Sequence, residues 1–174
     1  GVEEVVRILG IDPGTKCGYA IFSNGLYGVG YGNMPGGAIL ASGVWDLGSR
    51  RHEGGGMRYL RLRGLLAQAL AGVDAVAYEE VRHHIGTDAA HVYGGIVATI
   101  SAECESLSIP YIGIPVGTIK KFATGHGAAK KDKMIEAFTK AVGREPQDDN
   151  EADAYFVAMV AARDLGMARD ISSL

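Results

Sequence analysis

Apolar residues occur along this chain in short runs that alternate with amphipathic stretches of helical spacing. Three of the runs follow one another with only turns between them, whereas the two later runs are each preceded by a helical stretch. The predicted strands span residues 5–12, 17–23, 39–47, 73–81 and 110–115. The predicted helices span residues 57–70, 89–107, 117–123, 131–142 and 149–165. The glycine-rich stretch 25–37 predicts a loop or a loose hairpin.

This order of elements predicts an α/β fold built on one mixed sheet. The first three strands are joined by turns and are expected to form an antiparallel ribbon, whereas helical crossovers make the last two strands parallel. We therefore expect a five-stranded sheet flanked by helices on both faces. Neither an internal repeat nor a linker interrupts the pattern, so we expect a single domain over residues 1–174.

Length and composition indicate a folded domain in a reducing compartment. Of 174 residues, 47% are hydrophobic and 21% are charged, which argues against disorder. The longest apolar run, 154–162, is half as long as a membrane span needs to be, and the acidic N-terminus is unlike a secretory signal. Cys17 and Cys104 form no CxxC motif, so two free thiols are expected. We expect a cytoplasmic protein with no membrane partner.

The net charge of −3 conceals two basic segments. Residues 115–144 carry seven basic and two acidic residues, and residues 50–63 carry five basic residues and one acidic residue. These balances of +5 and +4 leave −12 for the rest of the chain. Such segregation produces local positive fields suited to nucleic acid, and two solvated helix faces explain the same charges equally well.

Acidic residues close two of the predicted strands. Asp12 ends the first strand before a Pro-Gly turn, at a position where ordinary turn chemistry also favours aspartate. Glu79 and Glu80 end the fourth strand, and since side chains alternate along a strand, one of them shares a face with Asp12. A carboxylate fixed at the end of a central strand suits a divalent cation, which needs oxygen ligands in a fixed geometry.

A third acidic feature opens the last predicted helix. Acids in a first helical turn offset the helix dipole, and Asp148 with Glu151 three residues later resembles a capping box. Asp153 has no such explanation, because it shares a helix face with apolar core positions. A carboxylate in that place needs a partner, and Asp149 and Asn150 lie on the same helix face.

These three features support one another. The side chains of Asp12, Glu79 and Asp153, joined by Asp149 or Asn150, would form an acidic cluster that repels itself unless cations bind it. Two divalent ions about 3.5–4 Å apart activate water and stabilise the leaving oxygen of a phosphodiester. Nearby lysines would contact the phosphate backbone or the transition state. These lysines are Lys120, Lys121, Lys130, Lys131 and Lys133.

Four short motifs occur in order along the chain. They are Gly-Ile-Asp-Pro-Gly-Thr at 10–15, Tyr-Glu at 78–79, a two-lysine region over 114–131 and Glu-Ala-Asp-Ala at 151–154. Together they resemble the motifs of the RuvC-type Holliday junction resolvases, over about residues 5–165, and look most like phage or prophage members. The resemblance implies a ribonuclease H-like fold and a metal-dependent endonuclease. Such an enzyme cuts four-way DNA junctions by paired nicks that leave 5′-phosphates, and other branched DNA is a further candidate substrate.

The resemblance also implies roles for individual residues. Asp12, Glu79 and Asp153 match three of the family's four catalytic carboxylates. Lys131 matches the lysine that orients the attacking water or stabilises the transition state, and Lys120 matches a second lysine near the phosphates. The implied cofactor is Mg²⁺, with Mn²⁺ as a substitute and two ions per site.

Two positions depart from the bacterial pattern of this family. That pattern has aspartate where this chain has Asn150, so either Asp149 takes the role or Asn150 ligates through its amide oxygen; we favour Asp149. The bacterial enzymes also place an aromatic residue in the loop after the glutamate, where this chain has Arg82, His83 and His84. We expect these three residues to contact DNA, with the arginine stacking on an unpaired base.

Two other functions remain open at this stage. A ribonuclease H-like nuclease acting on RNA precursors would share the acidic cluster, and it would have little need for the second lysine group. A non-catalytic junction-binding module is the other alternative, which the asparagine at 150 keeps open. The resolvase interpretation implies a homodimer, with helix 89–107 as a candidate interface, because two nicks need two sites. It also implies the cytoplasm of a bacterium or of a phage-infected host.

Overall fold

The computed structural model describes residues 5–24, 36–84 and 86–172. The strands are β1 (Arg7–Asp12), β2 (Lys16–Ser23), β3 (Ala38–Asp46), β4 (Ala75–Glu80) and β5 (Tyr111–Pro115). The helices are α1 (Met57–Ala69), α2 (Thr87–Ser106), α3 (Val116–Thr124), α4 (Lys131–Val142) and α5 (Asp149–Ser172). All ten elements follow the predicted order, and α5 continues seven residues past its predicted end. Most of the predicted glycine-rich loop, residues 25–35, lies outside the described residues.

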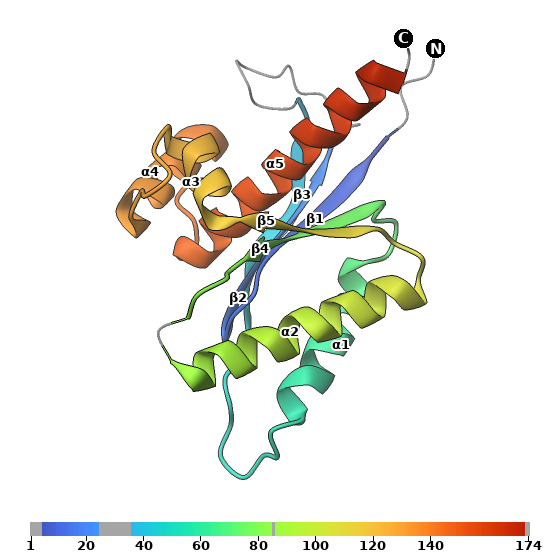
Figure 1. The fold of residues 1–174 in the computed structure, drawn as a ribbon, viewed down its shortest axis with the longest axis vertical. Coiled ribbons are helices and arrows are strands. Elements are labelled where there is room, and N and C mark those ends of the chain that lie inside the picture. Colours follow the sequence, from blue (N-terminus) through green and yellow to red (C-terminus); the bar gives the residue numbers. More distant parts are fainter. Residues whose placement is uncertain (1–4, 25–35, 85, 173–174) are drawn as a thin grey trace.

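The strands form one mixed sheet in the order β3-β2-β1-β4-β5 (Figure 1). β2 runs antiparallel to both β1 and β3, whereas β4 runs parallel to both β1 and β5. This topology confirms the predicted fold class. Because β1, β3, β4 and β5 run in one direction, their carboxyl ends lie along the same side of the sheet, which we call the carboxyl edge.

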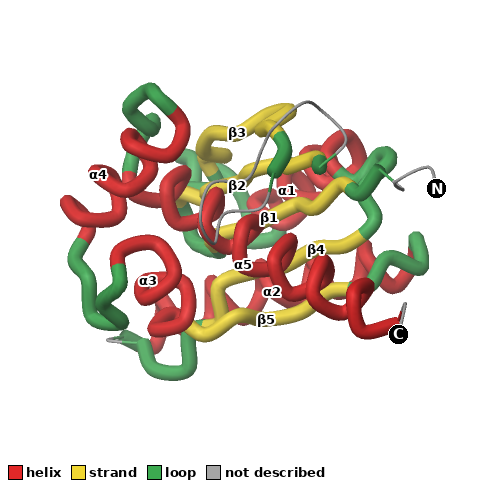
Figure 2. Tube along the Cα trace, turned by 90° about the horizontal axis from the view of Figure 1, so that it is seen from above, coloured by secondary structure: helices red, strands yellow, loops and turns green. Residues whose placement is uncertain are grey.

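Helices cover both faces of this sheet (Figures 1 and 2). α1 and α2 pack on one face in a core that includes Leu9 and Ile11 of β1. α3, α4 and α5 pack on the other face, where the core includes Ile8 and Ala77. Since side chains alternate along a strand, Asp12 lies on the same face as Ile8, which is the face covered by α5.

Two glycines let α5 lie directly on the central strands. A Cβ atom added to Gly10 of β1 would overlap the α5 backbone at Ala154 and Ala158, and one added to Gly18 of β2 would overlap the backbone of Asn150. The contact therefore has no room for a larger residue at either strand position. This close approach brings the first turns of α5 over the carboxyl end of β1.

Two expectations drawn from composition also concern the fold. Cys17 and Cys104 are both buried and free, as predicted. Within the described ranges, none of the helices has the length and apolar character needed to cross a membrane.

Candidate metal centre

Three carboxylates converge at the carboxyl edge, on the face covered by α5. Asp12 ends β1, Glu79 precedes the last residue of β4, and Asp153 lies one turn into α5. One oxygen of each carboxylate lies within 4.8 Å of the other two. The structure thus brings together three acids from distant parts of the sequence, in an arrangement that could hold a metal ion.

The position of β4 explains why Glu79, and not Glu80, joins this cluster. β4 pairs in parallel with β1, and Ala77 belongs to the core under α5. Because alternate residues of a strand share a face, Glu79 follows Ala77 toward α5. Glu80 points to the other face, where its Oε2 lies 3.8 Å from Nη2 of Arg82. Strand alternation alone predicts that one of the two glutamates joins Asp12, and the register selects Glu79.

The clustered carboxyls are unfavourable places for negative charge in the absence of a cation. Burial, followed by the charges of Glu79 and Asp153, raises the pKa of Asp12 well above its usual 3.8. Burial likewise raises the pKa of Glu79, while its side-chain contact with Asp12 and the charge of Lys120 oppose that rise. The pKa of Asp153 rises to about 8, through burial and then neighbouring carboxylates, while Lys120 and Lys131 oppose the rise. A bound cation would lower the free-energy cost of ionising each of these three carboxyls.

The donor set fits a hard divalent cation. Oδ1 of Asp153 is buried and has no hydrogen-bond partner among the described residues. A buried oxygen of this kind costs free energy unless a donor or a cation meets it. Each of the three residues offers a carboxylate oxygen, the ligand type that Mg²⁺ and Mn²⁺ prefer.

The two candidates for a fourth ligand have different neighbours. Oδ2 of Asp149 lies 3.4 Å from Nζ of Lys131, and the charge of Asp149 raises the pKa of each clustered carboxyl. Asn150 instead donates from Nδ2 to Oδ2 of Asp148 at 3.1 Å. Asp149 therefore lies at the margin of the cluster, whereas the amide of Asn150 is engaged at the start of α5.

The predicted capping box is present, with its second contact displaced by one residue. Oδ1 of Asp148 accepts a hydrogen bond from the Glu151 N–H at 3.2 Å, and Oε1 of Glu151 accepts one from the Gln147 N–H at 2.7 Å. Oε2 of Glu151 accepts hydrogen bonds from Arg144 and Ser42. Glu151 is only 1% exposed, so this network fixes the start of α5 and with it the acids that follow.

Lysines lie beside the cluster on α3 and α4. Lys120, half-buried on α3, opposes the rise in pKa of both Glu79 and Asp153. Lys131 begins α4, and its side chain is 83% exposed. The structure thus places both lysines of the predicted two-lysine region next to the carboxylates. The other predicted lysines, all exposed, are Lys121, Lys130 and Lys133.

The end of β4 is held by a residue that sequence analysis did not single out. The hydroxyl of Tyr93 on α2 accepts a hydrogen bond from the Val81 N–H and donates one to the Glu79 carbonyl, both at 2.9 Å. The His84 ring packs on Tyr93 with 4.7 Å between ring centroids, so His84 turns toward α2. A single tyrosine in an apolar helix pattern carries no signal for such a contact. The exposed residues of this loop are Arg82 and His83.

Comparison with known proteins places this geometry in a family. No family model matches the chain. A curated relative, the crossover junction endodeoxyribonuclease RuvC of Synechococcus sp. (strain WH7803), is 32% identical over 165 residues, which cover 88% of this chain and 96% of the relative. Among solved structures, T. thermophilus RuvC in complex with a Holliday junction substrate matches with a TM-score of 0.78 and 21% identity, over 94% of this chain and 96% of that one.

A more distant structure has the same architecture. The yeast mitochondrial Holliday junction resolvase Ydc2 matches with a TM-score of 0.62 and 14% identity, over 91% of this chain and 78% of that one. These structural matches confirm the ribonuclease H-like fold. The curated relative extends the likeness to sequence over nearly the whole length of both proteins. The chain therefore belongs to the RuvC family of crossover junction endodeoxyribonucleases.

Proposed function

We propose that the protein is a metal-dependent endonuclease that resolves four-way DNA junctions. The observation that carries the proposal is the convergence of Asp12, Glu79 and Asp153 at the carboxyl edge, in a chain of the RuvC family. The curated relative is named for cleavage at crossover junctions, and one matching structure holds a Holliday junction. Both findings support the same substrate class for this chain.

The proposed reaction is hydrolysis of a phosphodiester by water, leaving a 5′-phosphate and a 3′-hydroxyl. Asp12, Glu79 and Asp153 hold the metal, and Asp149 completes the set from the margin of the cluster. When bound, two divalent ions such as Mg²⁺, or Mn²⁺ in its place, activate water and stabilise the leaving oxygen. Lys131, next to Asp149, stabilises the negative charge that develops on the phosphate in the transition state. Lys120 and the exposed lysines of α3 and α4 contact neighbouring phosphates.

The proposal includes a homodimer, because paired nicks across a symmetric junction need two sites. α2 is the candidate interface. Its buried residues on one side are Ile96, Ile100 and Cys104. Its exposed small residues on another side are Gly94, Ala98 and Ala102. Two copies of such a side can approach closely around a twofold axis. We place this activity on DNA in the cytoplasm of a bacterium or of a phage-infected host.

The test is cleavage of a labelled four-way junction beside linear duplex, flap and RNA substrates, each with Mg²⁺, Mn²⁺ or EDTA. We expect paired nicks in the junction, with 5′-phosphate ends, only when a metal is present. Cleavage confined to RNA would support the RNA-processing alternative. Tight junction binding with no cleavage in either metal would make the protein a junction-binding module.

The fourth ligand is tested by two separate substitutions. Asp149→Asn is expected to lower the single-turnover cleavage rate by about 10²-fold, because a charge beside the metal is lost while the shape is kept. Asn150→Ala is expected to cost less than about tenfold, since its amide hydrogen-bonds with Asp148. Rates are measured at saturating junction over a range of Mg²⁺ concentrations. The opposite ranking of the two variants would assign the ligand to Asn150.

Lys131→Ala is expected to separate chemistry from binding. The single-turnover rate at saturating junction should fall by about 10²-fold, as when one transition-state donor is removed, with junction affinity little changed. Lys120→Ala is expected to lower both. The control is Lys133→Ala, an exposed lysine of the same helix that pairs with Glu136. Because Lys133 is assigned only to phosphate contacts, this variant should keep the single-turnover rate at saturating junction, whatever it loses in affinity. Equal losses of affinity and rate in Lys131→Ala would assign that lysine to DNA binding alone.

A further inference from the structure

The second basic segment of the sequence, 50–63, has no part in the proposed mechanism. Its first half belongs to the connection between β3 and α1, residues 47–56, which we call the arginine loop. The loop leaves the sheet at the carboxyl edge, where the Leu47 N–H donates to the Thr15 carbonyl at 2.7 Å. Thr15 lies in the turn that follows Asp12, so the arginine loop begins at the same edge of the sheet as the metal centre.

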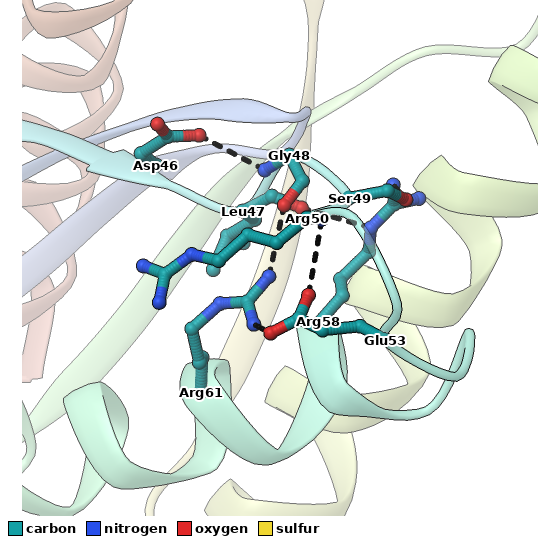
Figure 3. A network of polar contacts seen from close by, with 8 residues as sticks. All are labelled: Asp46, Leu47, Gly48, Ser49, Arg50, Glu53, Arg58 and Arg61. Atoms are coloured by element: carbon teal, nitrogen blue, oxygen red, sulfur yellow. Dashed lines mark hydrogen bonds and ion pairs between the residues drawn. The ribbon is translucent and has the colours of Figure 1, made fainter.

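Two arginines of α1 hold this loop in place (Figure 3). Arg58 donates from Nε to the Leu47 carbonyl at 2.8 Å and from Nη2 to a serine hydroxyl of the loop. Arg61 donates from Nη2 to the Gly48 carbonyl at 2.8 Å and forms an ion pair through Nη1 with Glu53. The side chains of that pair are 17% and 19% exposed, so they serve to order the loop and are largely withdrawn from solvent.

The tip of the arginine loop is a turn with an uncommon backbone conformation. The Arg50 N–H donates to Oε2 of Glu53 at 3.0 Å, and the Glu53 N–H donates to the Arg50 carbonyl at 3.3 Å. Between them His52 has a φ of 66°, in the region that glycine favours. Such strain persists only where surrounding contacts impose it. Here those contacts keep Arg51 and His52 exposed at the tip.

The loop carries more positive charge than its own contacts neutralise. Glu53 is the only acidic residue from 47 to 58, and its partner is Arg61. Asp46, just before the loop, accepts the Gly48 N–H, and this contact, followed by the charges of nearby basic side chains, lowers its pKa. In Figure 3 the Arg50 side chain extends away from the Glu53 carboxylate. Arg50 and Arg51 of the loop, and Arg58 at the start of α1, form no ion pair with any described residue.

We propose that the arginine loop binds the sugar-phosphate backbone of a DNA arm next to the metal centre; this inference rests on the proposed function. Guanidinium groups pair with phosphate oxygens through two parallel hydrogen bonds, and a loop that is already ordered loses little entropy on binding. Glycines 54–56 follow the tip, and a Cβ atom at any of them would meet no atom within 4 Å. Packing does not require glycine there, and the bare backbone lets a second backbone approach closely.

The test measures junction binding by fluorescence anisotropy in EDTA, between about 50 and 200 mM salt. The double variant Arg50→Ala/Arg51→Ala is expected to reduce the slope of log affinity against log salt by about 2 and to weaken binding at low salt by about tenfold or more. Its cleavage rate at saturating junction in Mg²⁺ should stay unchanged. The control Arg63→Ala/Arg163→Ala removes two charges that pair with Glu103 and Asp164, and should keep the wild-type slope.

A second variant tests whether the order of the loop matters. Glu53→Ala removes a negative charge, so electrostatics alone predicts tighter junction binding. Loss of the Arg61 and Arg50 contacts predicts binding about two- to tenfold weaker, and we expect this result. His52→Gly, which keeps the turn conformation, should bind like the wild type.

Each outcome separates this inference from the proposed function. If the wild type binds and cuts the junction and the double arginine variant keeps its salt slope, the inference fails and the proposed function stands. Tighter binding by Glu53→Ala would overturn the role given to loop order. If the wild type binds no junction at all, both proposals fail.

Discussion

Replacing Asp12 with asparagine is expected to abolish junction cleavage while leaving the fold and junction binding intact. Asp12 is one of the three clustered carboxylates, and the amide keeps its shape while removing its charge. Loss of a metal ligand forfeits several kcal/mol of transition-state stabilisation, so we expect the rate to fall by about 10³-fold or more. Junction binding in EDTA should persist, because the substitution removes a carboxylate that would otherwise repel the DNA phosphates.

Glu80→Gln is the matched control for this experiment. Glu80 also ends β4, but it lies on the opposite face of the strand from Glu79 and pairs with Arg82. The change therefore removes a carboxylate from the same edge of the sheet without touching the cluster, and cleavage should stay at the wild-type rate. Full activity of Asp12→Asn in either metal would contradict the metal assignment, and equal losses in the two variants would point to a general charge effect.

Asp153→Asn is expected to inactivate the enzyme and at the same time stabilise its metal-free form. In the folded protein without metal, the pKa of Asp153 is about 8, against 3.8 for the unconstrained group. The folded state therefore binds more protons than the unfolded state between these values, and its stability falls as the pH rises through this window. Asparagine does not ionise, so the variant does not lose stability in this way as the pH rises. Each kcal/mol of added stability corresponds to a rise of about 2–4 °C in Tm at this chain length.

Thermal unfolding in EDTA from pH 5 to pH 8 measures this effect. The gap in Tm between Asp153→Asn and the wild type should widen with pH, and Mg²⁺ should raise the wild-type Tm more at pH 8 than at pH 5. Asp164→Asn, at an exposed acid on the same helix, should follow the wild-type curve. A variant that unfolds below the wild type at every pH would show that Asp153 stabilises the fold through contacts, contrary to the cost derived from burial.

The sheet and the acidic cluster could be predicted because both follow from short-range patterns. Turns between the first three apolar runs predict antiparallel neighbouring strands. Helical stretches before the last two apolar runs predict that these strands join the sheet in parallel. Period-two alternation then assigns Asp12 to one face of the sheet. An acid such as Asp153, on the buried side of an apolar helix, stands out because its burial has no explanation within the helix itself.

Contacts between distant residues could not be predicted in the same way. The choice of Glu79 over Glu80 depends on how β4 is placed against β1, and the role of Tyr93 depends on how α2 packs under that strand. The sequence showed that segment 50–63 is basic, but it did not show which arginines form ion pairs. The path of the loop determines that Arg61 pairs with Glu53 while the Arg50 side chain points away from it.

The close contact of α5 with Gly10 and Gly18 has a consequence for folding during synthesis on the ribosome. Asp12 and Glu79 emerge early, but Asp153 follows Glu79 by 74 residues. At about 5–20 residues per second, roughly 4–15 s of synthesis separate the second acid from the third. A nascent chain in that interval lacks the third of the clustered carboxylates. If these acids hold the metal as proposed, cleavage begins only after the last helix has packed on the two glycines, and the rate of translation sets when that happens.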